Sequence, residues 1–483
     1  MNSKMNKTDV LVIGGGISGL SVARLLANAG IRVELWEREN RTGGMIKTQM
    51  HDGYRLEQSA SIVMNFRADV KRFLTECGLD EYKTPLAPKT KRHLVLDDQL
   101  CPVPMKLRSM MTSPLWSWRG KLRMALEPFI KKGGDENESA ASFIRRRLGN
   151  EFLEKAMDPF IAGPLASDPE LANAFSVLPR LTALEQRYGS LMLGMMAHKL
   201  SGRRTAIPKE SFSFDNGMST LTDKLANSSN ITVRNQCEAI ELIRTNQGWR
   251  IHGRTGVADH VLHAKQIIIS TPADTAANLI HNIDTELSSL LSTIEYVPVS
   301  VVHTGFDRNA ISHPLEGNGF LTPGNGKLDV NGCLWMSNLL PDCVPDGKVL
   351  MSNYLGGARK PEAASWDKEH CIDKIMQDLK PLLGIRHEPE MVYIHRHKQG
   401  LPMYNGAYKT HINKIKKRLD DLPGLHFSAN YIGGISVRDR IACAYKLAGR
   451  IVPEFMHATH KRKSFYFRFN DIPQPELEPG NPG

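Results

Sequence analysis

The sequence is poor in cysteine, and it contains neither a CxxC pair nor a long apolar run. Its cysteines are odd in number and scattered, which argues against a disulfide framework and against a zinc site. No apolar stretch approaches the roughly 18 residues that a spanning helix needs, and no apolar signal region precedes Val10. We therefore expect a cytoplasmic protein with no bound metal that does not cross a membrane. The cysteines are Cys77, Cys101, Cys237, Cys333, Cys343, Cys371 and Cys443.

The positive charge of the chain is unevenly distributed. The net charge is +11, and residues 89–210 contain 20 Lys and Arg against 13 Asp and Glu. Between Trp116 and Lys132, apolar and basic residues alternate, which suits a helix lying in the headgroup region of an anionic membrane. A solvated helix whose apolar stripe packs on its own domain explains the pattern equally well. Nucleic acid is the weakest of the three interpretations, because no recognised nucleic-acid module accompanies the charge.

The stretch from Asp9 to Thr48 carries the clearest functional signal. An apolar run of strand length, 10–13, stops at glycines and is followed by an Ala- and Leu-rich segment suited to a helix. Gly14 permits the turn, Gly16 lets backbone N–H groups approach a pyrophosphate, and Gly19 lets the helix pack closely on the strand. The pattern predicts a dinucleotide-binding loop, and its candidate cofactor-binding residues are Gly14, Gly15, Gly16, Ile17, Ser18 and Gly19.

A second apolar run, 32–36, ends at Glu37, whose carboxylate is placed to accept hydrogen bonds from a ribose. A glycine-rich turn alone is often only structural, but here the strand, the helix and the acidic residue are all present. The continuation ExxxRxGG, from Glu37 to Gly44, resembles the flavin-binding variant of the fold in the amine oxidase and protoporphyrinogen oxidase superfamily. The resemblance implies FAD rather than NAD.

The rest of the chain alternates between sheet and helix patterns. With 483 residues, it is longer than one hydrophobic core usually serves, so we expect two or three domains. Short β-type runs separated by glycines over 298–358 are typical of an antiparallel sheet. The basic, then Pro-rich tail 461–483 is expected to be poorly ordered. We also expect helices at 139–160 and 218–225, strands at 231–233, 249–251 and 261–269, and a strand followed by a helix within 425–451.

The middle of the chain specifies the resemblance further. Its blocks look like those of the oxygen-dependent protoporphyrinogen oxidases, whereas amine oxidases and carotene desaturases share only the flavin-binding ends. The similarity extends from about residue 9 to residue 452. The blocks are 142–149, 159–163, Asp168-Pro169, Pro179-Arg180-Leu181, 185–190, 214–218 with Thr220-Leu221, 270–273, 317–321 and 354–358.

The resemblance implies an enzyme of tetrapyrrole synthesis. Such an enzyme uses FAD to oxidise a porphyrinogen, protoporphyrinogen IX or coproporphyrinogen III, and passes the electrons to oxygen with release of hydrogen peroxide. The implied fold is α/β, with a Rossmann-type FAD-binding domain assembled from discontinuous segments, an antiparallel-sheet substrate domain and a mainly helical membrane-associating domain. The implied bounds are 8–88, 212–285 and 420–455 for the first, 286–419 for the second and 89–211 for the third. Peripheral contact with the inner face of the cytoplasmic membrane and a homodimer are further expectations.

The same resemblance assigns individual residues. Arg92 matches the arginine that pairs with a substrate propionate, although its default interpretation is a solvated surface arginine. Leu321, Leu334 and Tyr354 match positions that clamp the macrocycle, and by default they would be ordinary sheet core. The FAD positions beyond the loop are Arg38, Arg41, Gly43, Gly44, Met45, Cys237, His397, Ile435, Ser436 and Val437, of which Cys237 could equally be an inert buried thiol.

Several positions depart from the family pattern. Ser59 and Ser167 stand where glycine is usual, and a side chain at 167 would narrow the substrate slot. His395 and His397 share one face of a strand, but no further clustered ligands support a metal site. Two alternatives therefore remain: a related amine oxidase or desaturase acting on another apolar molecule, and an FAD- or porphyrin-binding protein with little turnover. The other departures are His397, Met403 and Tyr408, with Ala429 and Ala444 in place of glycine.

Overall fold

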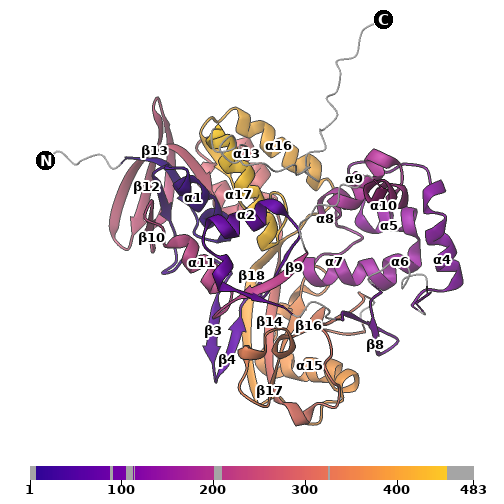
Figure 1. Ribbon diagram of the computed structural model, residues 1–483. Helices are drawn as coiled ribbons and strands as arrows, with labels where there is room; N and C mark the ends of the chain where they lie inside the picture. Colours follow the sequence, from indigo (N-terminus) through magenta and orange to yellow (C-terminus); the bar gives the residue numbers. More distant parts are fainter. Residues whose placement is uncertain are drawn as a thin grey trace, which may run out of the picture.

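The computed structural model describes residues 7–86, 91–104, 112–113, 115–200, 209–324 and 327–453. In Figure 1 these residues form a mainly parallel sheet flanked by helices, a second sheet below it, and a group of helices at one side. The expected tail 461–483, and Met105, Met110 and Met111 of the basic segment, lie outside the described residues.

The first sheet combines strands from three separate stretches of the chain. Five of its strands run parallel in the order β10-β2-β1-β13, with β19 beside the second half of β13, while β12 and β11 continue the sheet as an antiparallel hairpin. The bounds are β1 (Lys7–Ile13), β2 (Val33–Trp36), β10 (Ile231–Arg234), β11 (Glu238–Thr245), β12 (Gly248–Thr255), β13 (Ala258–Ile269) and β19 (Leu425–Phe427).

Helices cover both faces of this sheet, because the apolar side chains of β1 point alternately to one face and to the other. Val10 and Val12 are buried in one core, whereas Leu11 and Ile13 are buried in the other, because successive side chains of a strand point to opposite faces. Parallel strands that are buried on both faces become such continuous apolar runs. The first core includes α1 (Ile17–Asn28), α2 (Ala68–Glu76), α11 (Ser219–Ala226) and α17 (Val437–Ile451); the second includes α12 (Ala273–Ile280), α13 (Thr285–Ser292) and α16 (Tyr408–Asp420).

The second sheet has the order β18-β14-β17-β16-β15-β7-β8, with antiparallel neighbours except β15 and β7. One face packs on α15 (Lys368–Leu383), and the long strand β18 leads back towards the first sheet (Figure 1). The strands are β7 (His93–Leu96), β8 (Gln99–Pro102), β14 (Tyr296–Asp307), β15 (Gly319–Leu321), β16 (Gly332–Trp335), β17 (Lys348–Gly356) and β18 (Met391–Pro402). Smaller sheets pair β3 (Thr48–His51) with β4 (Tyr54–Glu57), and β5 (Val63–Asn65) and β6 (Lys83–Pro85) with β9 (Glu210–Phe214).

The helical part is stabilised by a buried ion pair. The side chains of Arg147 and Glu127 are fully buried and 2.7 Å apart. Glu127 also accepts hydrogen bonds from Ser190 Oγ and from the N–H of Leu191, which ties the last helix of this part to the first. Its elements are α4 (Trp118–Ala125), η2 (Glu127–Phe129), α5 (Ala140–Leu148), α6 (Asn150–Phe152), the π-helical turn η3 (Leu153–Met157), α7 (Asp158–Leu165), α8 (Ala174–Val177), α9 (Pro179–Tyr188) and α10 (Leu191–Leu200).

The structure differs from three of our expectations about element and domain bounds. The helix expected over 139–160 is interrupted at Gly149, whose φ of +95° breaks the helical path. Strands β7 and β8 pair with the second sheet, although we assigned 89–211 to the helical domain. α13 and α16 pack in the core of the first sheet, although we assigned 286–419 to the substrate domain. Strand pairing decides the first of these last two cases and packing in the core of a distant sheet decides the second, and the local sequence pattern reports neither.

Candidate functional site

The glycine loop between β1 and α1 is packed tightly on one side and open on the other. Gly14 has a φ of +102°, which favours glycine. A Cβ at Gly19 would lie 2.0 Å from the carbonyl oxygen of Gly14, so this glycine is required for helix and strand to approach. A Cβ at Gly16 would meet only Gly44 Cα, at 4.0 Å. Gly16 therefore faces space that a ligand can occupy, whereas Gly14 and Gly19 serve the protein itself.

Glu37 fixes the shape of this loop. Its carboxylate accepts hydrogen bonds from the N–H of Gly15, at 2.6 Å, and of Glu39, at 2.9 Å, and it lines the cavity described below. The N–H of Cys237 donates to the carbonyl of Glu37 at 2.9 Å, so Cys237 reaches the same wall from the end of β10. Cys237 is buried, and burial raises the pKa of its thiol. The backbones of Glu37 and Cys237 are thus adjacent, and both residues line the wall where a ribose and an adenine are expected.

Arg41 stabilises the next loop from within. Its guanidinium donates to the carbonyls of Thr42, Ile46 and Gly44, and Arg41 does not line the cavity. Gly43 pairs with the glycine loop through a hydrogen bond from its N–H to the carbonyl of Gly15. Arg41 positions this loop, and its direct contact with the cofactor stays a prediction. Arg38, Gly43, Gly44 and Met45 line the cavity, and Gly15 and Gly19 lie behind its wall.

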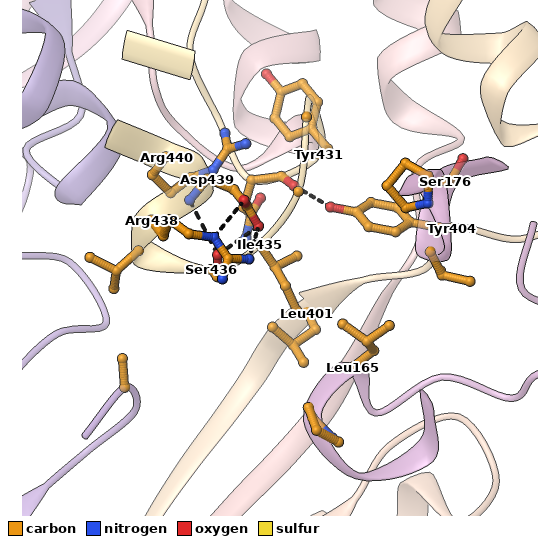
Figure 2. Close-up of a pocket in the computed structure, with 18 of the residues that line it drawn as sticks. Leu165, Ser176, Leu401, Tyr404, Tyr431, Ile435, Ser436, Arg438, Asp439 and Arg440 are labelled. Atoms are coloured by element: carbon orange, nitrogen blue, oxygen red, sulfur yellow. Dashed lines mark hydrogen bonds and ion pairs between the residues drawn. The ribbon is translucent and has the colours of Figure 1, made fainter. Parts of the chain in front are cut away.

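The start of α17 forms the opposite wall. Ser436 caps the helix by accepting a hydrogen bond from the N–H of Asp439, and its hydroxyl donates to the carboxylate of Asp439 at 2.6 Å. Figure 2 shows these residues in the cavity lining together with Ile435, Leu401 of β18 and Leu165 of the helical part. Ile435, Ser436, Val437 and His397 all line the cavity, and the His397 ring nitrogen lies 2.7 Å from the carbonyl oxygen of Gln58.

From this wall the same cavity continues to the second sheet. Its volume is about 3640 Å³, several times the roughly 300–1,000 Å³ usual for a small-molecule site. Leu321, Leu334 and Tyr354 line its far end, and burial raises the pKa of Tyr354 to about 12. Arg92 lines it too, and its guanidinium donates to the sulfur of Met64 at 3.0 Å. The structure therefore brings most of the residues assigned to the cofactor, together with Arg92, Leu321, Leu334 and Tyr354, to the wall of one continuous cavity.

The positions that depart from the family pattern have different surroundings. Ser167 is buried and absent from the cavity lining, and its hydroxyl donates to the carbonyl of Leu165, so the structure does not show the narrowing we expected there. Ser59 lines the cavity and donates to the carbonyl of Met45. Tyr408 also lines the cavity, while Met403 does not. Of these substitutions, Ser59, His397 and Tyr408 line the cavity.

Three buried groups near the junction of the sheets, His303, His395 and Glu57, have displaced pKa values. Burial lowers the pKa of His303 to about 3 and that of His395 to about 4, so both rings are neutral near pH 7. Burial raises the pKa of Glu57 to about 7, against the hydrogen bonds it accepts from the N–H of Met218 and the hydroxyl of Thr48. The two histidines therefore carry little charge at neutral pH, whereas Glu57 ionises in that range.

Comparison with known proteins decides the family. Residues 17–437 match the family described as flavin containing amine oxidoreductase. The chain belongs to that family. It is 29% identical to the mitochondrial protoporphyrinogen oxidase of Nicotiana tabacum (92% of this chain, 94% of the relative) and 25% identical to the coproporphyrinogen III oxidase of Bacillus subtilis (90% and 96%). A crystal structure from Exiguobacterium sp. 255-15 shares the fold, with a TM-score of 0.76, 21% identity, and coverage of 94% of this chain and all of that one.

The residues present fit the cofactor of this flavin family. α1 begins without a side-chain cap and without an acidic residue in its first turn, so its positive end can face phosphates. Ser270 and Thr271 line the cavity beside Gly14, and their buried hydroxyls have no hydrogen-bond partner within the described part of the chain. Gly16 leaves room for a pyrophosphate against the backbone. The protein is an FAD-dependent oxidoreductase.

The described residues contain neither a metal-binding cluster nor a helix suited to crossing a bilayer. Among the residues that the structure places, no cluster of three or more His, Cys, Asp or Glu side chains could hold a metal ion. In that same part of the chain, no helix combines the length and the hydropathy needed to cross a bilayer.

Some residues of this flavoprotein site were missed by sequence reasoning. Ser270 and Thr271 belonged to a block that we quoted for its resemblance only. Arg180 and Arg438 line the cavity from α9 and α17. A charged residue gives no sign in the sequence of whether it faces solvent or a cavity, so only the assembled fold could identify the last two.

Proposed function

We propose that this flavoprotein oxidises a porphyrinogen, protoporphyrinogen IX or coproporphyrinogen III, to the porphyrin, with oxygen as the electron acceptor and hydrogen peroxide as the second product. The observation that supports this proposal is that the cofactor loop, the apolar residues of the second sheet and Arg92 line one cavity. The names of the tobacco and Bacillus relatives point to the same substrates.

The residues of the chain would divide the task between them. Leu321, Leu334 and Tyr354 would bury the macrocycle and exclude water from it, since apolar walls with a few polar groups are typical of such sites. Arg92 would pair with a propionate, because no described carboxylate forms an ion pair with it. The bound flavin supplies the hydride acceptor. We propose that the chain's own contribution is to orient the ring and to hold its acidic side chain.

Arg92 provides the test. Arg92→Ala should raise the apparent KM for the free-acid porphyrinogen about tenfold or more, because a hydrogen bond to a charged group contributes roughly 1.5–3 kcal/mol. Arg92→Lys should restore part of this loss, since an ammonium keeps the charge without the planar geometry of a guanidinium. The measurement is porphyrin fluorescence appearing with time in air.

An esterified porphyrinogen serves as the control, because it lacks the negative charge and should be oxidised similarly by wild type and Arg92→Ala. Equal KM values for the free acid would remove the charged contact from the proposal. In that event a related amine oxidase or desaturase with another apolar substrate becomes the better assignment. Flavin binding without any turnover of either porphyrinogen would instead favour a low-turnover FAD- or porphyrin-binding protein.

We further propose that the helical part binds peripherally to the anionic inner face of the cytoplasmic membrane. Trp118 and Phe129 are 69% and 82% exposed, and Leu122 and Leu126 between them are exposed as well. Leu115, Trp116 and Met124 are buried, so part of this segment belongs to the hydrophobic core. This burial is what the interpretation of a helix packed on its own domain requires. The exposed apolar residues of α10, Leu193, Met195, Met196 and Leu200, belong to the helix that packs beside η2. Association of two copies stays a prediction.

A further inference from the structure

Arginines converge on one short stretch of the cavity wall, residues 64–67, which joins β5 to α2. Arg92 donates to the sulfur of Met64 at 3.0 Å, and Arg438 donates to the carbonyl of Met64, also at 3.0 Å. The guanidinium carbons of Arg180 and Arg438 lie 3.8 Å and 4.1 Å from the centre of the Phe66 ring. Arginine at this distance from an aromatic ring is attracted by its quadrupole and held in orientation. All five side chains line the cavity.

The arginines of this wall differ in whether a carboxylate neutralises them. Arg67 forms a two-pronged pair with Asp69, at 2.9 Å and 2.5 Å. Arg438 pairs with Asp439 at 3.2 Å. Arg180 makes no hydrogen bond and no ion pair with any residue that the structure describes, although it lies at the wall of a cavity. Its positive charge is therefore available to a ligand.

The surroundings of Arg180 favour the binding of an anion beside it. Partial burial and the nearby charge of Arg438 lower the pKa of Arg180 to about 10, although Asp439 opposes this effect. The guanidinium is still protonated at neutral pH. Two like charges beside one ring repel each other, and a ligand carboxylate would relieve that repulsion while making charge-assisted hydrogen bonds.

We propose that Arg180, held on Phe66 beside Arg438, is a second carboxylate-binding site of the cavity, distinct from Arg92. The inference rests on the proposed function and refines its substrate class to macrocycles with two neighbouring carboxylate arms. One arm binds Arg92 and the other binds Arg180, on either side of residues 64–66. Protoporphyrinogen IX and coproporphyrinogen III both carry propionates on adjacent pyrrole rings, so both satisfy this requirement.

A double-mutant cycle tests the second site. The FAD-loaded protein is titrated with protoporphyrin IX, which cannot be oxidised further, and binding is followed by porphyrin fluorescence. Arg92→Gln and Arg180→Gln should each weaken binding about tenfold or more, and the double variant should weaken it by the product of the two factors. Arg180→Lys should bind between wild type and Arg180→Gln. The dimethyl ester of protoporphyrin IX, in the same detergent, should bind all four proteins of the cycle alike.

Arg250→Gln is the matched control, because Arg250 is an exposed arginine of β12 and lies outside the cavity lining. It should bind like wild type. Unchanged binding by Arg180→Gln, with an intact flavin spectrum and melting temperature, would overturn the second site while leaving the proposed function standing. A double variant no weaker than the single ones would mean that both arginines hold one carboxylate, and it would overturn the second site as well. Failure of the wild type to bind the porphyrin would overturn the proposed function itself.

Discussion

Gly16 and Gly19 are three residues apart in the same loop, yet substitutions at the two should fail for different reasons. A side chain at Gly16 has room in the protein and would occupy the space for the pyrophosphate. Gly16→Val should therefore fold and lose its flavin. Gly19→Val should lose stability, because its Cβ would lie 2.0 Å from the Gly14 carbonyl oxygen. Flavin absorbance and thermal melting measure the two effects separately, and full flavin occupancy in Gly16→Val would show that the loop does not hold the dinucleotide.

Glu57 should make stability depend on pH in a direction opposite to that of most acidic residues. Its pKa is about 7 in the folded protein, raised from 4.5 by burial. Below pH 4, Glu57 is protonated in both the folded and the unfolded state, so its titration does not change the free energy of unfolding there. Between pH 4.5 and 7 the unfolded chain releases its proton first, so the folded state becomes relatively less stable. The loss is complete above pH 7 and is on the order of 3 kcal/mol.

Glu57→Gln removes this titration while keeping an oxygen that can accept from the Met218 N–H. The variant should melt at a higher temperature than wild type at pH 8 and at a similar temperature at pH 4.5. Melting curves at the two pH values measure the difference, and other titrating groups cancel in the comparison. An equal melting temperature at pH 8 would show that Glu57 is already ionised without cost in the folded protein.

At the scale of single elements, α1 and α17 present their N-termini to the same cavity in different ways. The first turn of α1 has no cap within the protein, whereas Ser436 and Asp439 already satisfy the start of α17. A helix N-terminus without a cap is suited to a phosphate, because its N–H groups and dipole both favour negative charge. We infer that α1 contributes binding energy for the cofactor and that α17 contributes shape.

The helix α4 with η2 allows the membrane proposal to be tested at one element. Phe129→Ser and Trp118→Ser should each weaken sedimentation with vesicles that contain anionic lipid, because each exposed side chain would otherwise be buried at the interface. Binding should also weaken as salt rises. Val257→Ser is the control, since Val257 is fully exposed on the distant β12–β13 turn. No sedimentation of the wild type at low salt would leave α4 as a packed helix with a solvated face.

The fold could be predicted from sequence where one element carries its own signal. The strand, the glycines and Glu37 follow one another closely in the sequence, so the local sequence pattern was enough to predict the loop and the role of Gly16. The domain bounds that the resemblance implied place β7 and β8 in the helical part, whereas β7 pairs with β15, more than two hundred residues further along the chain. Arg180 was beyond reach for a similar reason: its partners Phe66 and Arg438 come from distant stretches that only the assembled core brings together.

At the scale of the whole molecule, the cavity lies where the three parts of the structure meet. Its lining comes from the first sheet and its helices, from β14, β15, β16, β17 and β18 of the second sheet, and from helices of the helical part that include α7 and α9. A ligand there contacts all three parts at once, and in the unfolded chain those contacts do not exist. Binding of FAD should consequently stabilise the molecule as a unit rather than one part of it.

Removal of FAD should therefore lower the melting temperature of the whole protein. A ligand that binds only the folded state stabilises it by RT ln(1 + [L]/Kd), which is about 2.7 kcal/mol at a hundredfold excess over Kd. Adding FAD back should raise the melting temperature with increasing concentration, and Gly16→Val should show no such rise because its site is blocked. Calorimetry with and without FAD measures this. If the apoprotein instead lost only the transition of one part, with the others unchanged, the cofactor would stabilise its own part alone and the cavity would not couple the three.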